Sequence, residues 1–162
     1  MIRVVAGDLA RQAVDAVLRP ADGALAPVGD TAVRLDAAGG DRLAAERRTT
    51  TPLEAGAAVV TGAGELAAGY VLHVVIADER GPGTRDTIRR ALVSAWQRAG
   101  DWGLTRVAAP LVGVASGQLT VDESVRLLVD TVPRGADGVE LTIVVEAAAE
   151  CDVVDAIVRR VT

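Results

Sequence analysis

The stretch "GAAVVTGAGELAAGYVLHVV", residues 56–75, holds two short apolar runs separated by small and flexible residues. The runs at 56–61 and 70–76 are rich in Val and shorter than typical helices, as is usual for strands buried on both faces. The stretch therefore predicts a strand, a turn and a second strand. His73, the only histidine, lies inside the second run, and we interpret it as a hydrogen-bonded structural residue rather than a catalytic one.

Similar Val-rich runs occur on both sides of this stretch, and segments with helical spacing lie between and after them. The other predicted strands are residues 2–5, 13–18, 106–112 and 140–146. The predicted helices are residues 30–47, 84–101, 120–132 and 151–160. This order predicts an α/β fold with three α/β/α layers and a mixed central sheet of about six strands. In such folds, ligands bind outside the carboxyl ends of the strands.

Three helix boundaries have local signals. Thr84 or Asp86 can cap the helix over 84–101, and Thr120 with Glu123 has the form of a capping box. Gly39 and Gly40 predict a C-cap or a break within the segment 30–47. The glycine- and proline-containing segment 78–85 is predicted to be a flexible surface loop.

The segment "PLVGVASGQLTVDES", residues 110–124, leads from a predicted strand into the capped helix. Its small residues allow a close approach of the backbone, and a helix N-terminus favours negative charge. A backbone cradle for a phosphate is one interpretation. The alternative is a glycine turn that serves only the geometry of the chain.

Three polar residues follow or end the first two predicted strands. Asp8 can accept hydrogen bonds from an exocyclic amine or a hydroxyl, or it can cap a turn. The segment 18–30 is rich in Pro and Gly and is predicted to be a loop rather than a central strand. Within it, Asp22 can bind ribose hydroxyls or start a turn, and Arg19 can pair with a phosphate or form a salt bridge.

The composition limits the function classes. The chain has 162 residues, of which 50% are hydrophobic, so it is predicted to fold as a single domain over residues 1–162. The net charge of −5 disfavours nucleic-acid and anionic-membrane surfaces. A single cysteine, Cys151, and no signal-peptide pattern predict a cytoplasmic protein. No apolar run spans a bilayer and no residue cluster has metal-ligand spacing, so neither a membrane segment nor a metal or cofactor is expected.

Taken in order, five segments resemble the macrodomain family, whose fold binds ADP-ribose. Residues 56–75 resemble its Gly-x-Ala-x-x-Thr-x-Gly-x-x-Leu-x-x-x-Tyr-Val-Ile-His segment most specifically. "GDL" at 7–9 resembles its Gly-Asp-Ile turn, and "VDAVLRPAD" at 14–22 resembles its Val-Asp-Ala-Ile-Val-Asn-Ala-Ala-Asn strand. Residues 32–43 are similar to its helix ending in Ala-Ala-Gly, and 110–119 to its second phosphate loop.

The resemblance implies a ligand site in which Asp8 recognises the adenine amino group and Asp22 stands beside the distal ribose. Residues 113–117 would wrap the diphosphate. The full set of implied ligand-binding residues is Asp8, Leu9, Arg19, Asp22, Gly29, Gly113, Val114, Ala115, Ser116 and Gly117.

The sequence departs from the family pattern at this implied site. Arg19 and Asp22 replace the two family asparagines, and the first glycine-rich loop is reduced to residues 26–32. Val114 and Ala115 stand where many members have Thr and Gly, so a Cβ could obstruct a phosphate. The resemblance therefore implies a diverged ligand site.

Three functions remain open at this point. The first is a binding module for ADP-ribose, for a related nucleotide diphosphate or for an ADP-ribosylated protein. The second is an ADP-ribosyl hydrolase, for which Asp22 is the candidate catalytic group. The third is a degenerate member that no longer binds ADP-ribose and acts as an interaction domain.

Overall fold

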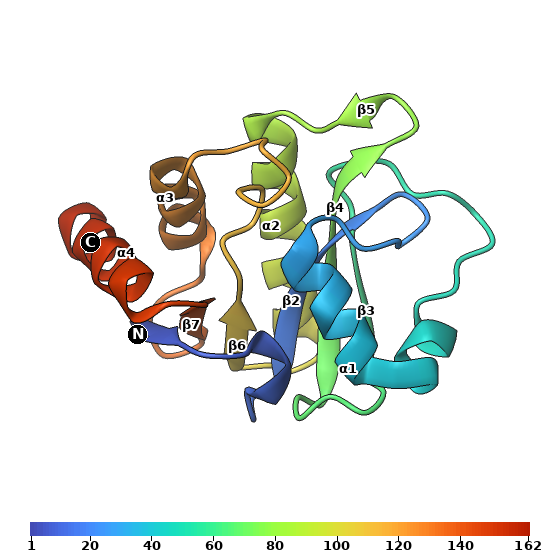
Figure 1. Ribbon diagram of the computed structural model, residues 1–162, viewed down its shortest axis with the longest axis horizontal. Coiled ribbons are helices and arrows are strands. Elements are labelled where there is room, and N and C mark those ends of the chain that lie inside the picture. Colours follow the sequence, from blue (N-terminus) through green and yellow to red (C-terminus); the bar gives the residue numbers. More distant parts are fainter.

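A mixed β-sheet forms the centre of the molecule (Figure 1). The computed structural model describes residues 1–162. Six strands lie in the order β1-β7-β6-β2-β4-β3, and a seventh, β5, pairs with β4. The strands from β1 to β4 in this order are parallel, whereas β3 and β5 run antiparallel to β4. The strand bounds are β1 Ile2–Ala6, β2 Ala16–Asp22, β3 Ala58–Gly62, β4 Tyr70–Asp78, β5 Gly81–Pro82, β6 Arg106–Ala109 and β7 Glu140–Val145.

Helices cover both faces of the sheet, which confirms the predicted α/β class and its three layers. The helices are α1 Asp30–Glu46, α2 Arg85–Asp101, α3 Val121–Thr131 and α4 Ala148–Val161, with a short 3₁₀ helix, η1, at Leu9–Arg11. Buried side chains of α2, α3 and α4 pack on one face, and those of α1 and η1 pack on the other. None of the helices has the length and hydropathy needed to cross a bilayer.

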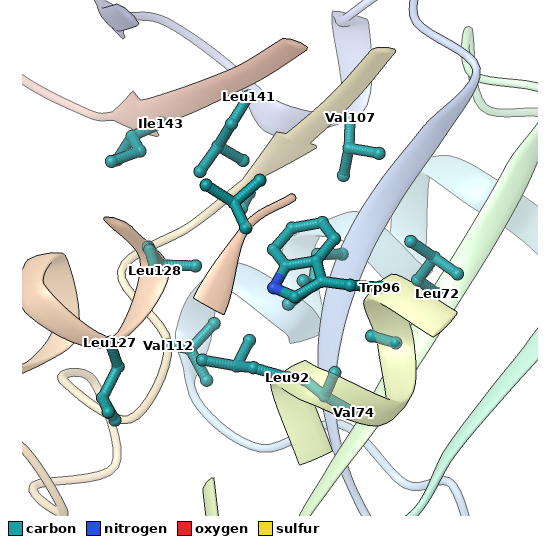
Figure 2. Packing of buried hydrophobic residues seen from close by; sticks show 14 of the residues in the cluster. Leu72, Val74, Leu92, Trp96, Val107, Val112, Leu127, Leu128, Leu141 and Ile143 are labelled. Atoms are coloured by element: carbon teal, nitrogen blue, oxygen red, sulfur yellow. The ribbon is translucent and has the colours of Figure 1, made fainter. Parts of the chain in front are cut away.

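The larger core lies between the sheet and α2, α3 and α4, and Trp96 is at its centre. Figure 2 shows the indole ring among aliphatic side chains such as Leu72, Leu128 and Leu141. The indole nitrogen of Trp96 donates to Thr131 Oγ1 at 2.9 Å, so the one polar atom of this side chain has a hydrogen-bond partner. Most of this core is built from Val, Leu, Ile and Ala.

The predicted helix signals agree with the structure. Thr84 caps α2, and Thr120 and Glu123 form both hydrogen bonds of a capping box at the start of α3. Gly40 has φ +67° and ψ −165°, so α1 is kinked there and continues to Glu46. The two adjacent glycines thus mark a break rather than the end of the helix.

The prediction that residues 18–30 form a loop is wrong for residues 18–22. Strand β2 continues through Pro20 to Asp22 and pairs with β4 over this length. On its other side β2 pairs with β6 only at Ala16 and Val17. The carbonyl of Pro20 accepts from Val28 on this unpaired side, and its nitrogen points the same way. A proline is therefore tolerated because no strand requires its missing N–H.

Two other boundaries differ from the sequence prediction. The segment 78–85 contains the two-residue strand β5, which pairs with the end of β4 rather than forming an open loop. Strand β6 ends at Ala109, before Pro110, whereas the apolar run predicted a strand to residue 112. Because proline has no N–H to donate, it ends the ladder where apolar composition alone does not.

Candidate ligand-binding site

A cavity of about 420 Å³ opens at the carboxyl ends of the parallel strands, where the fold class predicts a ligand site. Its lining comes from four parts of the chain: the segment after β1, the end of β2 with the start of α1, the loop after β6, and the end of β7 with the segment that follows it. The lining residues are Gly7, Asp8, Leu9, Ala10, Pro20, Val28, Asp30, Thr31, Ala32, Arg34, Leu35, Pro110, Leu111, Gly113, Val114, Ala115, Ser116, Val144, Val145, Glu146 and Glu150.

The loop over residues 110–119 is a compact turn rather than an open strap. Gly113 has φ +82°, and its carbonyl accepts from the backbone N–H groups of Gln118 and Leu119. The Gln118 side chain donates to the carbonyls of Ile76 and Gly83 at 2.8 and 3.0 Å, which ties the loop to β4 and to the start of α2. These hydrogen bonds hold the loop against the sheet and the segment before α2.

Five backbone N–H groups of this loop have no protein acceptor, those of Leu111, Val112, Gly113, Ala115 and Ser116. All of these residues except Val112 line the cavity. By contrast, the neighbouring amides of Val114 and Gly117 donate to carbonyls within the loop. Unpaired N–H groups gathered along one turn form an anion-binding concavity.

The N-terminus of α1 borders the same cavity. Gly29 occupies the N-cap position with φ +93°, and no side chain caps the helix there. The N–H groups of the first turn have no acceptor within the helix, and residues 30–32 line the cavity. The helix dipole adds a partial positive charge at this end. A Cβ on Gly29 would lie 2.9 Å from Ala115 Cβ, so α1 meets the 110–119 loop closely.

Asp8 lies at the mouth of the cavity, directly after β1. One carboxylate oxygen, Oδ1, caps η1 by accepting from Ala10 N at 3.0 Å. The other, Oδ2, lies 3.8 Å from Arg11 Nε, and the side chain is 58% exposed. One oxygen is therefore available to a ligand.

Arg19 does not line the cavity, although it belongs to the implied ligand-binding set. Its side chain is fully buried between the sheet and α1, where it donates to both carboxylate oxygens of Asp36 at 2.7 and 2.8 Å. It also donates to Leu25 O and contacts His73 Nδ1 at 3.1 Å. The salt-bridge alternative therefore describes its position.

His73 is part of the same buried network. Because arginine only donates, Nδ1 must accept from Arg19, and Nε2 carries the proton that His73 gives to Thr61 Oγ1 at 2.8 Å. Thr61 in turn donates to Gly62 O. Burial, aided by the charges of Arg19 and Arg47, lowers the pKa of His73 to about 3. The ring is therefore neutral and structural, as the apolar strand predicted.

Asp22 and the remaining predicted residues divide between the cavity and its surroundings. The Oδ1 atom of Asp22 accepts from Ala24 N and Ala26 N, so this carboxylate holds a turn and does not line the cavity. Gly29 and Gly117 lie beside lining residues without lining the cavity themselves. The remaining members of the set do line it: Asp8, Leu9, Gly113, Val114, Ala115 and Ser116.

Val114 and Ala115, which stand where many family members have Thr and Gly, cause no backbone strain in the loop. Leu25 is the only residue other than glycine with a positive φ, so neither Val114 nor Ala115 adopts that conformation.

Sequence reasoning missed the charged residues on two sides of the cavity. Arg34 lies one turn into α1, and Glu146 directly follows β7. The rule that directed attention to Asp8, a polar residue just after a parallel strand, also applies to Glu146. Arg34 carries no such signal, because its place at the cavity depends on how α1 is oriented on the sheet.

The chain is similar in sequence to known proteins. The model of the Macro domain family matches residues 19–128. A macro domain-containing protein of Streptomyces coelicolor is 31% identical over 143 residues, covering 81% of this chain and 82% of that protein. An uncharacterized protein of Mycobacterium tuberculosis is 29% identical over 137 residues, covering 85% of this chain. This chain spans only 38% of that relative's length.

Solved structures show the same fold. The Trypanosoma brucei macrodomain in complex with ADP-ribose superposes with a TM-score of 0.82 at 19% identity, covering 97% of this chain and 68% of that one. The Oceanobacillus iheyensis macrodomain superposes with a TM-score of 0.72 at 17% identity, covering 97% and 87%.

Proposed function

The chain belongs to the macro domain family, and we propose that its cavity binds ADP-ribose or a related nucleotide diphosphate. The observation that carries this proposal is that two groups of backbone N–H donors without protein acceptors border one cavity. One set comes from Gly113, Ala115 and Ser116, and the other from the first turn of α1. A diphosphate has oxygens enough to accept from both sets at once.

The fixed loop supports binding without a large rearrangement. Gln118 ties the 110–119 loop to the sheet, so the ordering of this loop is complete before the ligand enters. The net charge of −5 argues that backbone dipoles, rather than a basic surface, attract the phosphates. The Trypanosoma brucei macrodomain, which shares the fold, has been solved with ADP-ribose.

We carry over one further contact, at the adenine end of the ligand, from the family resemblance. The available oxygen of Asp8 would accept from the adenine amino group. The physiological form of the ligand would be free ADP-ribose or ADP-ribose attached to a protein. A chain with one cysteine suits a reducing compartment, so we place this protein in the cytoplasm.

The test is isothermal titration calorimetry of the purified protein with ADP-ribose, with AMP and ADP as comparison ligands. Micromolar affinity for ADP-ribose, stronger than for AMP, supports the proposal because AMP lacks the diphosphate. No heat at millimolar ADP-ribose, which corresponds to binding weaker than about −4 kcal/mol, contradicts it.

A further inference from the structure

The side chains that line the cavity are mostly acidic, whereas its backbone N–H groups favour an anionic ligand. Four carboxylates line it, those of Asp8, Asp30, Glu146 and Glu150, against one guanidinium, that of Arg34. Counted by formal charge, the lining therefore carries −3. A diphosphate adds two further negative charges. Arg34 is thus the only full positive charge in the lining that can offset them.

In the structure without a ligand, Arg34 is already engaged. Its terminal nitrogen Nη2 forms an ion pair with Glu146 Oε1, which connects α1 to the segment after β7. The same nitrogen lies 3.4 Å from Thr31 Oγ1, on the first turn of α1. Both partners of the ion pair remain more than half exposed, at 56% and 66% of their side-chain surface.

We propose that Arg34 is an anion-recognition residue of this cavity and that Glu146 is its internal competitor. When the ligand enters, the Arg34 guanidinium exchanges the Glu146 carboxylate for a phosphate oxygen of the diphosphate. This inference rests on the proposed function and adds a side chain to a site otherwise described through backbone groups.

Three observations support the exchange. Exposed ion pairs are weak, so the pair of Arg34 with Glu146 is readily broken. The guanidinium has five N–H donors in a fixed fork, a geometry that suits phosphate oxygens. Its contact with Thr31 keeps it beside the first turn of α1, which supplies unpaired N–H groups to the same cavity.

Calorimetry with ADP-ribose on three variants tests the role of each partner. Arg34→Gln is expected to weaken binding about tenfold, since it removes a charge-assisted hydrogen bond. Arg34→Lys keeps the charge and is expected to recover part of this loss. Glu146→Gln is expected to tighten binding about threefold, because the guanidinium no longer has to leave a carboxylate.

Matched controls separate exchange from simple charge effects. Glu150→Gln removes another lining carboxylate that forms no ion pair with Arg34, and it is expected to change affinity less than Glu146→Gln does. Asp155→Asn removes the same charge from an ion pair on α4 that does not line the cavity. This variant is expected to leave the ADP-ribose affinity unchanged.

The double variant Arg34→Gln/Glu146→Gln decides between competition and repulsion. If the exchange occurs, the gain in ADP-ribose affinity caused by Glu146→Gln should largely disappear when Arg34 is replaced. An equal gain in both backgrounds would show that Glu146 merely repels the ligand, and the inference would be wrong. If the wild-type protein binds ADP-ribose and Arg34→Gln binds it equally well, only this inference fails. A wild-type protein that does not bind overturns the proposed function as well.

Discussion

Two polar regions lie on the α1 side of the sheet, and they differ in whether their hydrogen-bonding groups have partners. In the buried network, every side-chain nitrogen of Arg19 has an acceptor, and both ring nitrogens of His73 are engaged. At the cavity, the N–H groups of Gly113, Ala115 and Ser116 donate to nothing within the protein. Arg19 and His73 thus have all their side-chain nitrogens paired within the protein, whereas the cavity border keeps unpaired donors.

The difference shows that polar chemistry alone does not identify a binding residue. Arg19 is the kind of residue that binds phosphate, yet Asp36 and the Leu25 carbonyl occupy its donors. Ala115 and Ser116 have no charged side chain, yet their backbone N–H groups have no acceptor in the protein. Burial of a charge requires such pairing, and a buried, paired group is not available to a ligand.

Removing Arg19 is expected to have the largest effect on this comparison. Arg19→Ala would leave the largely buried Asp36 carboxylate without its main partner and His73 without a donor to Nδ1. We expect the free energy of unfolding to fall by about 3–5 kcal/mol, measured by urea denaturation. Arg159→Ala breaks an exposed pair on α4 and should cost about 1 kcal/mol or less. Equal losses in the two variants would contradict the distinction between the regions.

The pH dependence of stability probes the same network through His73. The unfolded histidine gains a proton below about pH 6.5, whereas the folded one gains it only near pH 3. The contribution of His73 to stability is therefore complete above pH 6.5. It is lost as the pH falls from 6.5 toward 3, by at most about 1.4 kcal/mol per pH unit.

The variant His73→Gln isolates this contribution, since glutamine does not titrate. Urea denaturation of both proteins at several pH values between 7 and 4 should give curves whose difference varies with pH. A constant difference would mean that His73 takes up its proton over the same pH range in the folded and unfolded states, which contradicts the lowered pKa of the folded histidine.

Gly29→Ala tests the close contact between the two parts of the cavity border. The new Cβ would meet Ala115 Cβ at 2.9 Å, so α1 and the 110–119 loop must move apart. We expect ADP-ribose affinity to fall about tenfold, the equivalent of one charge-assisted hydrogen bond. Gly135→Ala has a similar φ, +96°, with open space around it. It should lose a comparable amount of stability, about 1 kcal/mol, with unchanged affinity.

Asp8→Ala is expected to have the smallest effect, because it removes one hydrogen bond at an exposed position. ADP-ribose affinity should fall about fivefold in calorimetry. The analogue carrying hypoxanthine, which lacks the amino group, should bind the wild-type protein more weakly than ADP-ribose does. If Asp8→Ala discriminates between the two ligands as well as the wild type, Asp8 does not recognise the amine.

Much of the fold follows from local patterns in the sequence. Val-rich runs predicted six of the seven strands, because the central strands are largely buried on both faces and are mostly apolar. Thr120 and Glu123 predicted the start of α3, because a capping box depends on neighbours in sequence alone. Strand β5 escaped prediction because Gly81 and Pro82 disfavour strands, and only pairing with β4 makes them one.

The site was predictable only in part, since partners far apart in sequence decide which polar groups remain open. The position of Asp8 and the small residues 113–116 followed from the rule that parallel strands end beside the ligand. The structural roles of Arg19 and Asp22 could not be predicted by this rule. The acceptors of Arg19 include Asp36 on α1, and the donors to Asp22 lie in the turn after β2. Whether Asp22 acts as a catalytic group stays a prediction.

The most direct test of the account is an amide ¹H–¹⁵N NMR titration of the protein with ADP-ribose. The N–H resonances of Gly113, Ala115 and Ser116 and those of residues 30–32 should shift most, since these groups would acquire phosphate acceptors. The amides of Ala24 and Ala26, which already donate to Asp22, should hardly move. Saturable shifts elsewhere, with the six border amides unchanged, would contradict the claim that unpaired backbone groups form the ligand site.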